Sequence, residues 1–192
     1  FFMEVITSSQ NQYVKKVRAL ASKKFRDETG LFVVEGGNIF KDLPENVDVE
    51  FLLATTEREA EVNKILAFTR TQAYYISDSL MKSLSDTVTP YGIIAVMKMP
   101  TPEFSLPNGN AILLDGVADP GNIGTIIRTA AACDFKNVYL LDTADPYSPK
   151  VVRATLGGLF KVNLIPVTLE QAIYLVENTS SVSLDMGGEN LL

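Results

Sequence analysis

The sequence predicts an α/β protein of two domains, a small N-terminal α/β sandwich followed by a parallel-sheet domain. Three observations lead to this prediction. Short apolar runs alternate with helical patterns along most of the chain. In the second half each run is apolar throughout and a helical pattern follows it, which is typical of a parallel sheet between helices. Residues 98–110 (KMPTPEFSLPNGN) hold three prolines and a glycine, so we place a linker at 99–110 between domains at 1–98 and 111–192.

The first domain begins with an amphipathic helical pattern at residues 8–25 (SSQNQYVKKVRALASKKF). Val14, Val17 and Ala21 fall on one side of this pattern, and the serines that open it are candidate N-caps. Four apolar runs follow, and they predict strands at 31–35, 49–54, 73–76 and 92–97. Helical patterns between these runs predict helices at 56–68 and 77–84.

The second domain alternates more regularly between strands and helices. Strands are predicted at 111–115, 137–142, 163–167 and 181–186, and helices at 122–133, 148–158 and 169–178. Ligands of such parallel sheets bind beyond the carboxyl ends of the strands. We therefore expect the functional site in the loops that follow these strands.

Composition excludes several kinds of chemistry. The 192-residue chain has no histidine and a single cysteine, Cys133, which excludes zinc clusters, histidine-dependent triads and a disulfide framework, and favours a reducing, cytoplasmic location. No apolar run reaches the roughly 18 residues of a membrane span. The net charge of −6 argues against a general nucleic-acid binder, yet residues 8–41 contain seven basic and three acidic residues. A basic end therefore precedes an acidic body.

The stretch DPGNIGTIIRTA, at residues 119–130, directly follows the first strand of the second domain. Asp119, Pro120 and Gly121 predict a turn, and Asn122 is a candidate cap for the next helix. Arg128 is the one charged residue on that helix, and a guanidinium held at the carboxyl end of a strand suits a phosphate or an oxyanion. The alternative is an ordinary turn whose arginine extends into solvent. Neither of the familiar glycine-rich phosphate-binding spacings is present in this stretch.

These residues carry a resemblance to a known family. Asn122, Gly124, Arg128 and Thr129 match the N-x-G-x-x-x-R-T signature of the SpoU (TrmH-like) RNA 2'-O-ribose methyltransferases of the SPOUT superfamily, and residues 153–157 resemble its R-A-[ST]-x-G block. In the first domain, NQYVKKVRAL, GLFVVEG and LSDTVTPYGIIAV are similar to the RNA substrate-binding domain of the ribosomal-RNA branch. The resemblance covers nearly the whole chain.

The resemblance implies methyl transfer from S-adenosylmethionine to a ribose 2'-hydroxyl, with ribosomal RNA as the expected substrate. By motif position, Arg128 acts at the ribose and its neighbouring phosphate, and Asn122 helps to arrange the loop. Because a guanidinium keeps its proton in proteins, we expect Arg128 to stabilise charge rather than to remove the hydroxyl proton. The resemblance also implies a homodimer, and no metal is expected.

RNA contacts are expected in both domains. Arg153 is expected to hold an RNA phosphate, and the alternative for it is a surface arginine that pairs with a carboxylate. In the first domain Lys23, Lys24, Arg26 and the turn at Glu35–Gly36 resemble the edge that contacts RNA. The alternative for these charges is a solvated face without a ligand.

The chain departs from the family pattern in its last residues. The family's G-N-E-G and E-S-L-N motifs, which build the trefoil knot and much of the cofactor pocket, have no counterpart here, so we expect a methyltransferase domain that stops before the knot. Asp185, Met186 and Gly187 are the expected cofactor contacts. This departure leaves two alternative functions: a non-catalytic RNA-binding remnant of such an enzyme, or an α/β enzyme that handles a phosphate on a small molecule.

Overall fold

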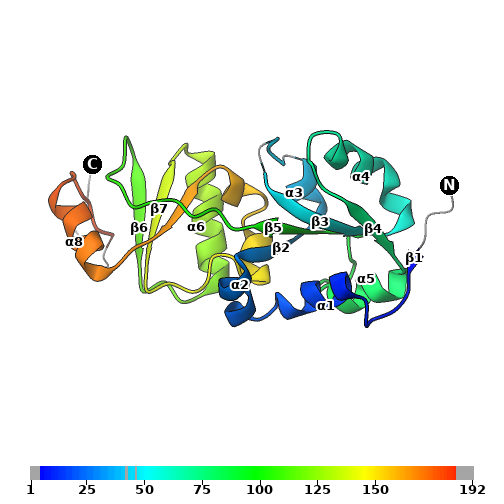
Figure 1. The fold of residues 1–192 in the computed structure, drawn as a ribbon. Helices are drawn as coiled ribbons and strands as arrows, with labels where there is room; N and C mark the ends of the chain where they lie inside the picture. The colour runs from blue at the N-terminus through cyan, green and yellow to red at the C-terminus, as the bar shows by residue number, and fades with distance from the viewer. Residues whose placement is uncertain (1–4, 42, 46, 185–192) are drawn as a thin grey trace.

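The computed structural model describes residues 5–41, 43–45 and 47–184 of the chain. It confirms the α/β class: a five-stranded mixed sheet forms the first half and a three-stranded parallel sheet forms the second (Figure 1). Within the described residues, no helix combines the length and the apolar composition that a membrane crossing requires.

The first sheet has the strand order β1-β4-β3-β5-β2, in which β5 is antiparallel to both of its neighbours and the other pairs are parallel. Its strands are β1 (Val5–Ile6), β2 (Leu31–Glu35), β3 (Val49–Ala54), β4 (Ala73–Ile76) and β5 (Ile93–Lys98). The helical elements are α1 (Gln12–Ala19), α2 (Lys23–Thr29), α3 (Gly37–Lys41), the 3-10 turn η1 (Thr56–Arg58), α4 (Glu59–Leu66) and α5 (Asp78–Leu84). The sequence patterns did not predict β1 and α3.

Helices cover both faces of this sheet, which explains why its strands carry apolar side chains at successive positions. On β5, Ile93 and Ala95 are buried in the cluster that contains α3 and α4, while Ile94 and Val96 are buried in the cluster that contains α1 and α5. Figure 1 shows α1 and α5 below the sheet and α3 and α4 above it. Successive side chains of a strand point to opposite faces, so each face receives its own hydrophobic core.

The predicted helix at residues 8–25 is two helices in the structure. Asn11, rather than a serine, caps α1 by accepting a hydrogen bond from the Tyr13 amide at 2.9 Å. The chain leaves the helix after Leu20, and α2 begins at Lys23. Helical periodicity in the sequence continues across this break, so the amphipathic pattern alone does not locate it.

The second sheet has the order β6-β7-β8, and its strands are parallel and in register. Its elements are β6 (Ala111–Asp115), α6 (Pro120–Ala132), β7 (Asn137–Leu141), α7 (Pro149–Ala154), the 3-10 turn η2 (Gly158–Phe160), β8 (Asn163–Pro166) and α8 (Leu169–Glu177). The strand expected at 181–186 is not observed over residues 181–184, and residues 185–186 lie outside the described part.

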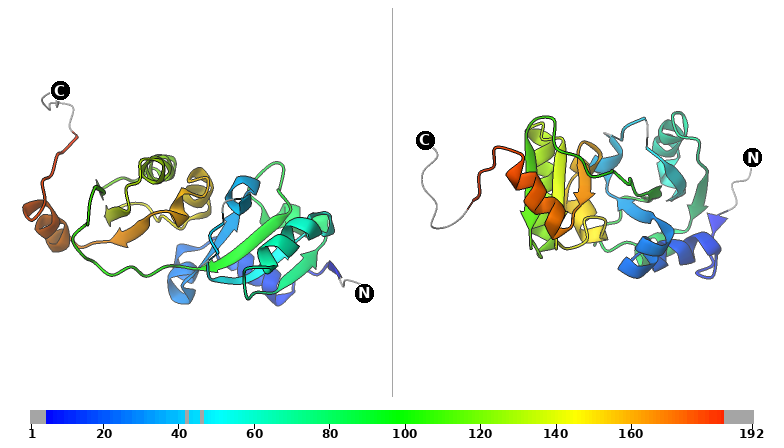
Figure 2. Two further views of the ribbon diagram at one scale, coloured as in Figure 1. Left: turned by 90° about the horizontal axis from the view of Figure 1, so that it is seen from above. Right: turned by 60° about the vertical axis from the view of Figure 1, so that its left-hand side comes forward.

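The two faces of the second sheet are covered differently. Helices α6 and α7 lie on the face that is turned toward the first domain, whereas α8 lies at the far end of the molecule (Figures 1 and 2). On the α8 side the segment between β5 and β6 packs against the sheet. Phe104 makes edge contacts with Tyr139 and Tyr174, and the Tyr139 hydroxyl donates a hydrogen bond to the Ser105 carbonyl at 2.7 Å.

One hydrophobic cluster joins the two domains. Phe32 and Val34 of β2 belong to the same buried cluster as Val151 and Val152 of α7. The Phe32 ring also contacts the Tyr147 ring, with 4.9 Å between their centroids. The domains therefore meet through a shared apolar core that includes α7.

Candidate active site

Helix α6 begins at a turn that follows the carboxyl end of β6. Asp119, and not Asn122, is its N-cap, because the Asp119 carboxylate accepts a hydrogen bond from the Asn122 amide at 2.8 Å. Pro120 occupies the first helical position, where its missing N–H group leaves no donor unsatisfied. Asn122 lies exposed in the first turn of the helix. The helix thus starts two residues earlier than the sequence pattern predicts.

Gly124 of the first signature block and Gly158, which directly follows the second block, lie at close helix contacts. A Cβ atom added to Gly124 would lie 2.4 Å from the Ala154 Cβ and 3.1 Å from the Val151 carbonyl oxygen, so α6 and α7 touch at this position. A Cβ added to Gly158 would lie 3.0 Å from the Arg128 Cα. Only glycine permits these two approaches without displacement of a helix. The second block therefore packs directly behind the first and fixes the backbone of Arg128.

Arg128 lies on the exposed strip of α6, which consists of Asn122, Thr125, Arg128, Thr129 and Ala132. The two threonine hydroxyls on this strip bond to backbone carbonyls of their own helix, at 2.9 Å each. The Arg128 guanidinium makes no hydrogen bond or ion pair with any residue that the structure describes. The structure thus brings Asn122 and Arg128 to one accessible surface and leaves the guanidinium available to a ligand.

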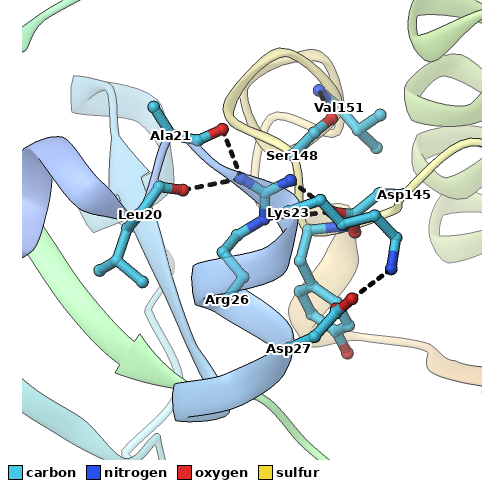
Figure 3. Close-up of polar contacts among 9 residues, drawn as sticks. Leu20, Ala21, Lys23, Arg26, Asp27, Asp145, Ser148 and Val151 are labelled. Carbon is cyan, nitrogen blue, oxygen red and sulfur yellow. Dashed lines mark hydrogen bonds and ion pairs between the residues drawn. The ribbon is translucent and has the colours of Figure 1, made fainter.

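Arg26, which was expected to contact RNA, is instead buried where the two domains meet. Only 3% of it is exposed, and its guanidinium binds Asp145 of the second domain through Nε at 3.1 Å and Nη2 at 2.5 Å. Nη1 donates to the carbonyls of Leu20 and Ala21, which the break between α1 and α2 leaves without helical partners (Figure 3). Arg26 therefore joins the domains, and its donors are occupied.

The two lysines of α2 remain at the surface. Lys23 pairs with Asp27 at 2.6 Å, and Lys24 approaches Glu28 at 3.8 Å. Both pairs link positions four apart on an exposed helix face, where such contacts contribute little free energy. An anionic ligand can therefore displace these carboxylates at small cost.

Glu35 and Arg153 come together, although they belong to different domains. They line the same cavity between the domains, to which α1, β2, α5 and α7 contribute. Arg153 pairs with Asp86 at 3.4 Å, so the alternative expected for it from the sequence, a carboxylate partner, is observed. Glu35 is buried, and Gly36 follows it with a positive φ of 126°.

The sequence analysis did not identify Asp145. One of its carboxylate oxygens accepts the Tyr147 amide at 2.8 Å within its own loop, and the other receives Arg26. Burial, with a smaller contribution from the Asp145 charge, raises the pKa of Tyr147 to about 12. The Asp-Pro pair at 145–146 was a signal for a turn, but nothing local to it indicates a partner 119 positions earlier in the chain.

Two further expectations concern the cofactor and metal binding. Asp185, Met186 and Gly187, the residues expected to contact the cofactor, lie outside the described residues. Within the described ranges there is no group of three or more histidine, cysteine, aspartate or glutamate side chains that could hold a metal ion.

Comparison with family models identifies both halves of the chain. Residues 11–95 match the MRM3-like substrate binding domain, and residues 109–191 match the SpoU rRNA Methylase family.

Curated relatives of the chain are also rRNA methyltransferases. The 23S rRNA (guanosine(2553)-2'-O)-methyltransferase RlmP of Bacillus subtilis is 32% identical over 164 residues, which are 85% of this chain and 65% of the relative. The human mitochondrial rRNA methyltransferase 3 is 31% identical over 157 residues, which are 75% of this chain and 37% of the relative. The chain thus spans less than two thirds of the length of these relatives.

Solved structures share the fold. An AdoMet-bound rRNA methyltransferase from Sinorhizobium meliloti superimposes with a TM-score of 0.79 and 29% identity, over 92% of this chain and 69% of that one. The SpoU methyltransferase AviRb from Streptomyces viridochromogenes, in complex with AdoMet, gives a TM-score of 0.75 and 27% identity, over 88% of this chain and 68% of that one.

Proposed function

This chain belongs to the SpoU rRNA methylase family, and from that premise we propose that it transfers a methyl group from S-adenosylmethionine to a ribose 2'-hydroxyl of ribosomal RNA. The observation that carries the proposal is the exposed strip of α6, where Asn122 and Arg128 occupy the signature positions. The Arg128 guanidinium has no partner within the described residues, and Gly158 packs against its backbone. Such an arrangement supports a positive charge on a fixed backbone that is accessible to a ligand.

Arg128 acts through its charge. A ribose 2'-hydroxyl is a weak nucleophile, because its pKa lies far above neutrality, and attack on a methyl group places negative charge on its oxygen. A guanidinium stays protonated and offers a planar fork of donors, so it can stabilise that oxygen together with a neighbouring phosphate. Donors fixed in advance at an oxyanion can lower a barrier by roughly 3 to 4 kcal/mol. We assign this role to Arg128 and the arrangement of the loop to Asn122.

The carboxyl edge of the parallel sheet is where we place the cofactor. Asp115 and Gly116, at the end of β6, are exposed, so nothing in the described part of the chain covers this end of the strand. This fits the general rule that ligands of parallel sheets bind at that edge. When bound there, S-adenosylmethionine supplies the methyl group. We assign Asp185, Met186 and Gly187 to its binding and expect the reaction to need no metal.

The substrate and the assembly state complete the proposal. The exposed Lys23 and Lys24 are assigned to RNA phosphates, which predicts that affinity falls as salt rises. Helix α8 exposes apolar side chains at Leu169, Ile173 and Val176, and this surface supports a homodimer, which light scattering can measure. We place the protein in the cytoplasm.

The test replaces Arg128 by alanine and by lysine and measures incorporation of labelled methyl groups into ribosomal RNA. We expect both variants to lose at least a hundredfold in methyl transfer, because lysine keeps the charge but loses the planar fork. Calorimetry should show unchanged S-adenosylmethionine affinity. Replacement of the exposed Arg70 in the first domain by alanine serves as the control for loss of one surface charge.

The same measurements separate the alternatives. Activity of the Arg128→Ala variant within a few-fold of the parent would contradict the proposed role. RNA binding without S-adenosylmethionine binding would identify a non-catalytic remnant. An activity that RNA does not affect would point to a small-molecule substrate.

A further inference from the structure

A cavity of about 140 Å³ lies between the two domains, outside the exposed strip of α6. Its polar lining includes Arg18 from α1, Glu35 from β2, Asp86 from the segment after α5, and Arg153 from α7. Ser83 and apolar valine, leucine, alanine and proline side chains form the rest of the wall. The cavity thus combines two guanidinium groups and two carboxylates with apolar surface.

Glu35 is the residue that points to a ligand. Only 5% of it is exposed. Its Oε1 atom accepts hydrogen bonds from the hydroxyls of Ser85 and Thr87. Its Oε2 atom has no hydrogen-bond partner among the described residues. This atom is not among the fully buried unpaired polar atoms of those residues, so part of its surface is accessible, and Glu35 lines the cavity. A carboxylate oxygen in such a place gains free energy when a donor reaches it.

The arginines supply the opposite charge. Arg153 bonds to Asp86 through Nη1 only, which leaves its other donors for a further partner. Arg18 is exposed and has no ion-pair partner within the described ranges. A ligand that satisfies this lining must carry N–H donors for Glu35 and an anionic group for the arginines. An unpaired nucleotide has both, on its base and on its phosphate.

We propose that this cavity binds one unpaired guanosine nucleotide of the RNA, with the base edge on Glu35 and the phosphate between Arg18 and Arg153. Guanine presents two adjacent N–H donors, N1–H and the N2 amine, on one edge. In uracil the single N–H donor lies between two carbonyl oxygens, which a carboxylate repels. Adenine and cytosine place an acceptor beside the amine. The inference rests on the proposed function only in taking RNA as the substrate.

The site would also connect the two halves of the protein. Arg153 precedes Ala154, the residue that contacts Gly124 of α6, while Glu35 and Arg18 belong to the first domain. A nucleotide held in the cavity therefore contacts both the substrate-binding domain and the helix that packs behind the signature motif.

The test measures binding and not methyl transfer, so a failure of the proposed chemistry cannot be confused with a failure of this site. Fluorescence anisotropy compares short single-stranded RNAs that contain one guanosine, one inosine or one uridine in the same flanking sequence. We expect the guanosine RNA to bind about tenfold tighter than the others, since inosine lacks the N2 amine. In Glu35→Gln this preference should fall to less than threefold, whereas Glu28→Gln, on the exposed face of α2, should keep it.

Arg18→Gln provides a second variant, at an exposed position where folding is not at risk. This variant should weaken the binding of all three RNAs to the same extent and reduce the salt dependence of that binding, because it removes a phosphate contact. The ligand could be a nucleotide within RNA or a free nucleotide, and free guanosine monophosphate distinguishes the two. We expect it to bind at least tenfold more weakly than the RNA. Equal affinity of the parent protein for all three RNAs would overturn the proposal, and so would an unchanged preference in Glu35→Gln. Binding of the free nucleotide as tightly as RNA would overturn the assignment to RNA.

Discussion

Replacement of Asp145 by asparagine should destabilise the protein by about 3 kcal/mol. The substitution preserves the size of the side chain and an oxygen that can accept the Tyr147 amide, but it removes the negative charge opposite the buried Arg26. Loss of one partner from a buried ion pair destabilises proteins by roughly 3 to 5 kcal/mol, because the remaining charge stays buried without compensation. Two carbonyls, those of Leu20 and Ala21, still accept from Arg26, so we expect the lower end of this range.

The assay is urea unfolding followed by circular dichroism. A loss of about 3 kcal/mol should appear as a lower midpoint with an unchanged dependence on urea. In thermal unfolding it corresponds to a fall in Tm of roughly 6 to 12 °C for a chain of this size. The double variant Arg26→Met/Asp145→Leu should recover part of the loss, since apolar side chains can replace a buried pair with little penalty.

Helix α2 offers a matched control for burial. Lys23 and Asp27 also pair at short distance, 2.6 Å, but their side chains are 63% and 56% exposed. Asp27→Asn should therefore cost at most about 0.5 kcal/mol. If Asp145→Asn were as mild as Asp27→Asn, the claim that Arg26 stabilises the contact between the domains would be wrong.

Two further predictions follow from the packing and the electrostatics of the same region. Gly124→Ala should destabilise the protein by about 1 to 3 kcal/mol and reduce methyl transfer, because the added Cβ would lie 2.4 Å from the Cβ of Ala154. Ala154→Gly in the same chain should partly restore both stability and methyl transfer, as measured in unfolding and activity assays. The raised pKa of Tyr147 means that the folded protein retains this proton as pH rises from 10 toward 12 while the unfolded chain loses it. The contribution of this group to the free energy of unfolding is therefore fully present below pH 10 and is lost as pH rises from 10 to about 12. Urea denaturation at pH 9 and pH 11 gives the fall in the free energy of unfolding between these two pH values. This fall should be about 1 kcal/mol smaller in Tyr147→Phe than in the parent. An identical fall in both proteins would contradict the burial of this phenol.

Strands were the part of the fold that the sequence predicted best. The runs at 31–35, 49–54, 73–76 and 111–115 became strands with the predicted bounds, because sheets that are buried on both faces require apolar side chains at successive positions. Helix boundaries were less predictable. At the start of α6 both Asp119 and Asn122 are good caps, and the proline after Asp119 was the signal that decides between them.

Tertiary contacts account for the rest. The break between α1 and α2 is stabilised by Arg26, which in turn depends on Asp145 in the other domain, so no local pattern reveals it. The sequence predicted an arginine near the carboxyl end of a strand, and in the structure Arg128 lies exposed in the second half of α6, the helix that follows β6. It could not show that Glu35 is buried beside an open cavity, because that environment is built from both domains.

The hydrophobic cluster that runs from β2 and α3 into α7 restricts how this protein can be recombined with its relatives. A chimaera that joins its first half to the second half of another family member would bring together two surfaces that were never selected to fit, and α7 would meet foreign side chains at β2. Exchange should succeed only when both sides of that contact are transplanted together. Over evolutionary time, substitutions on the two sides are therefore expected to be coupled.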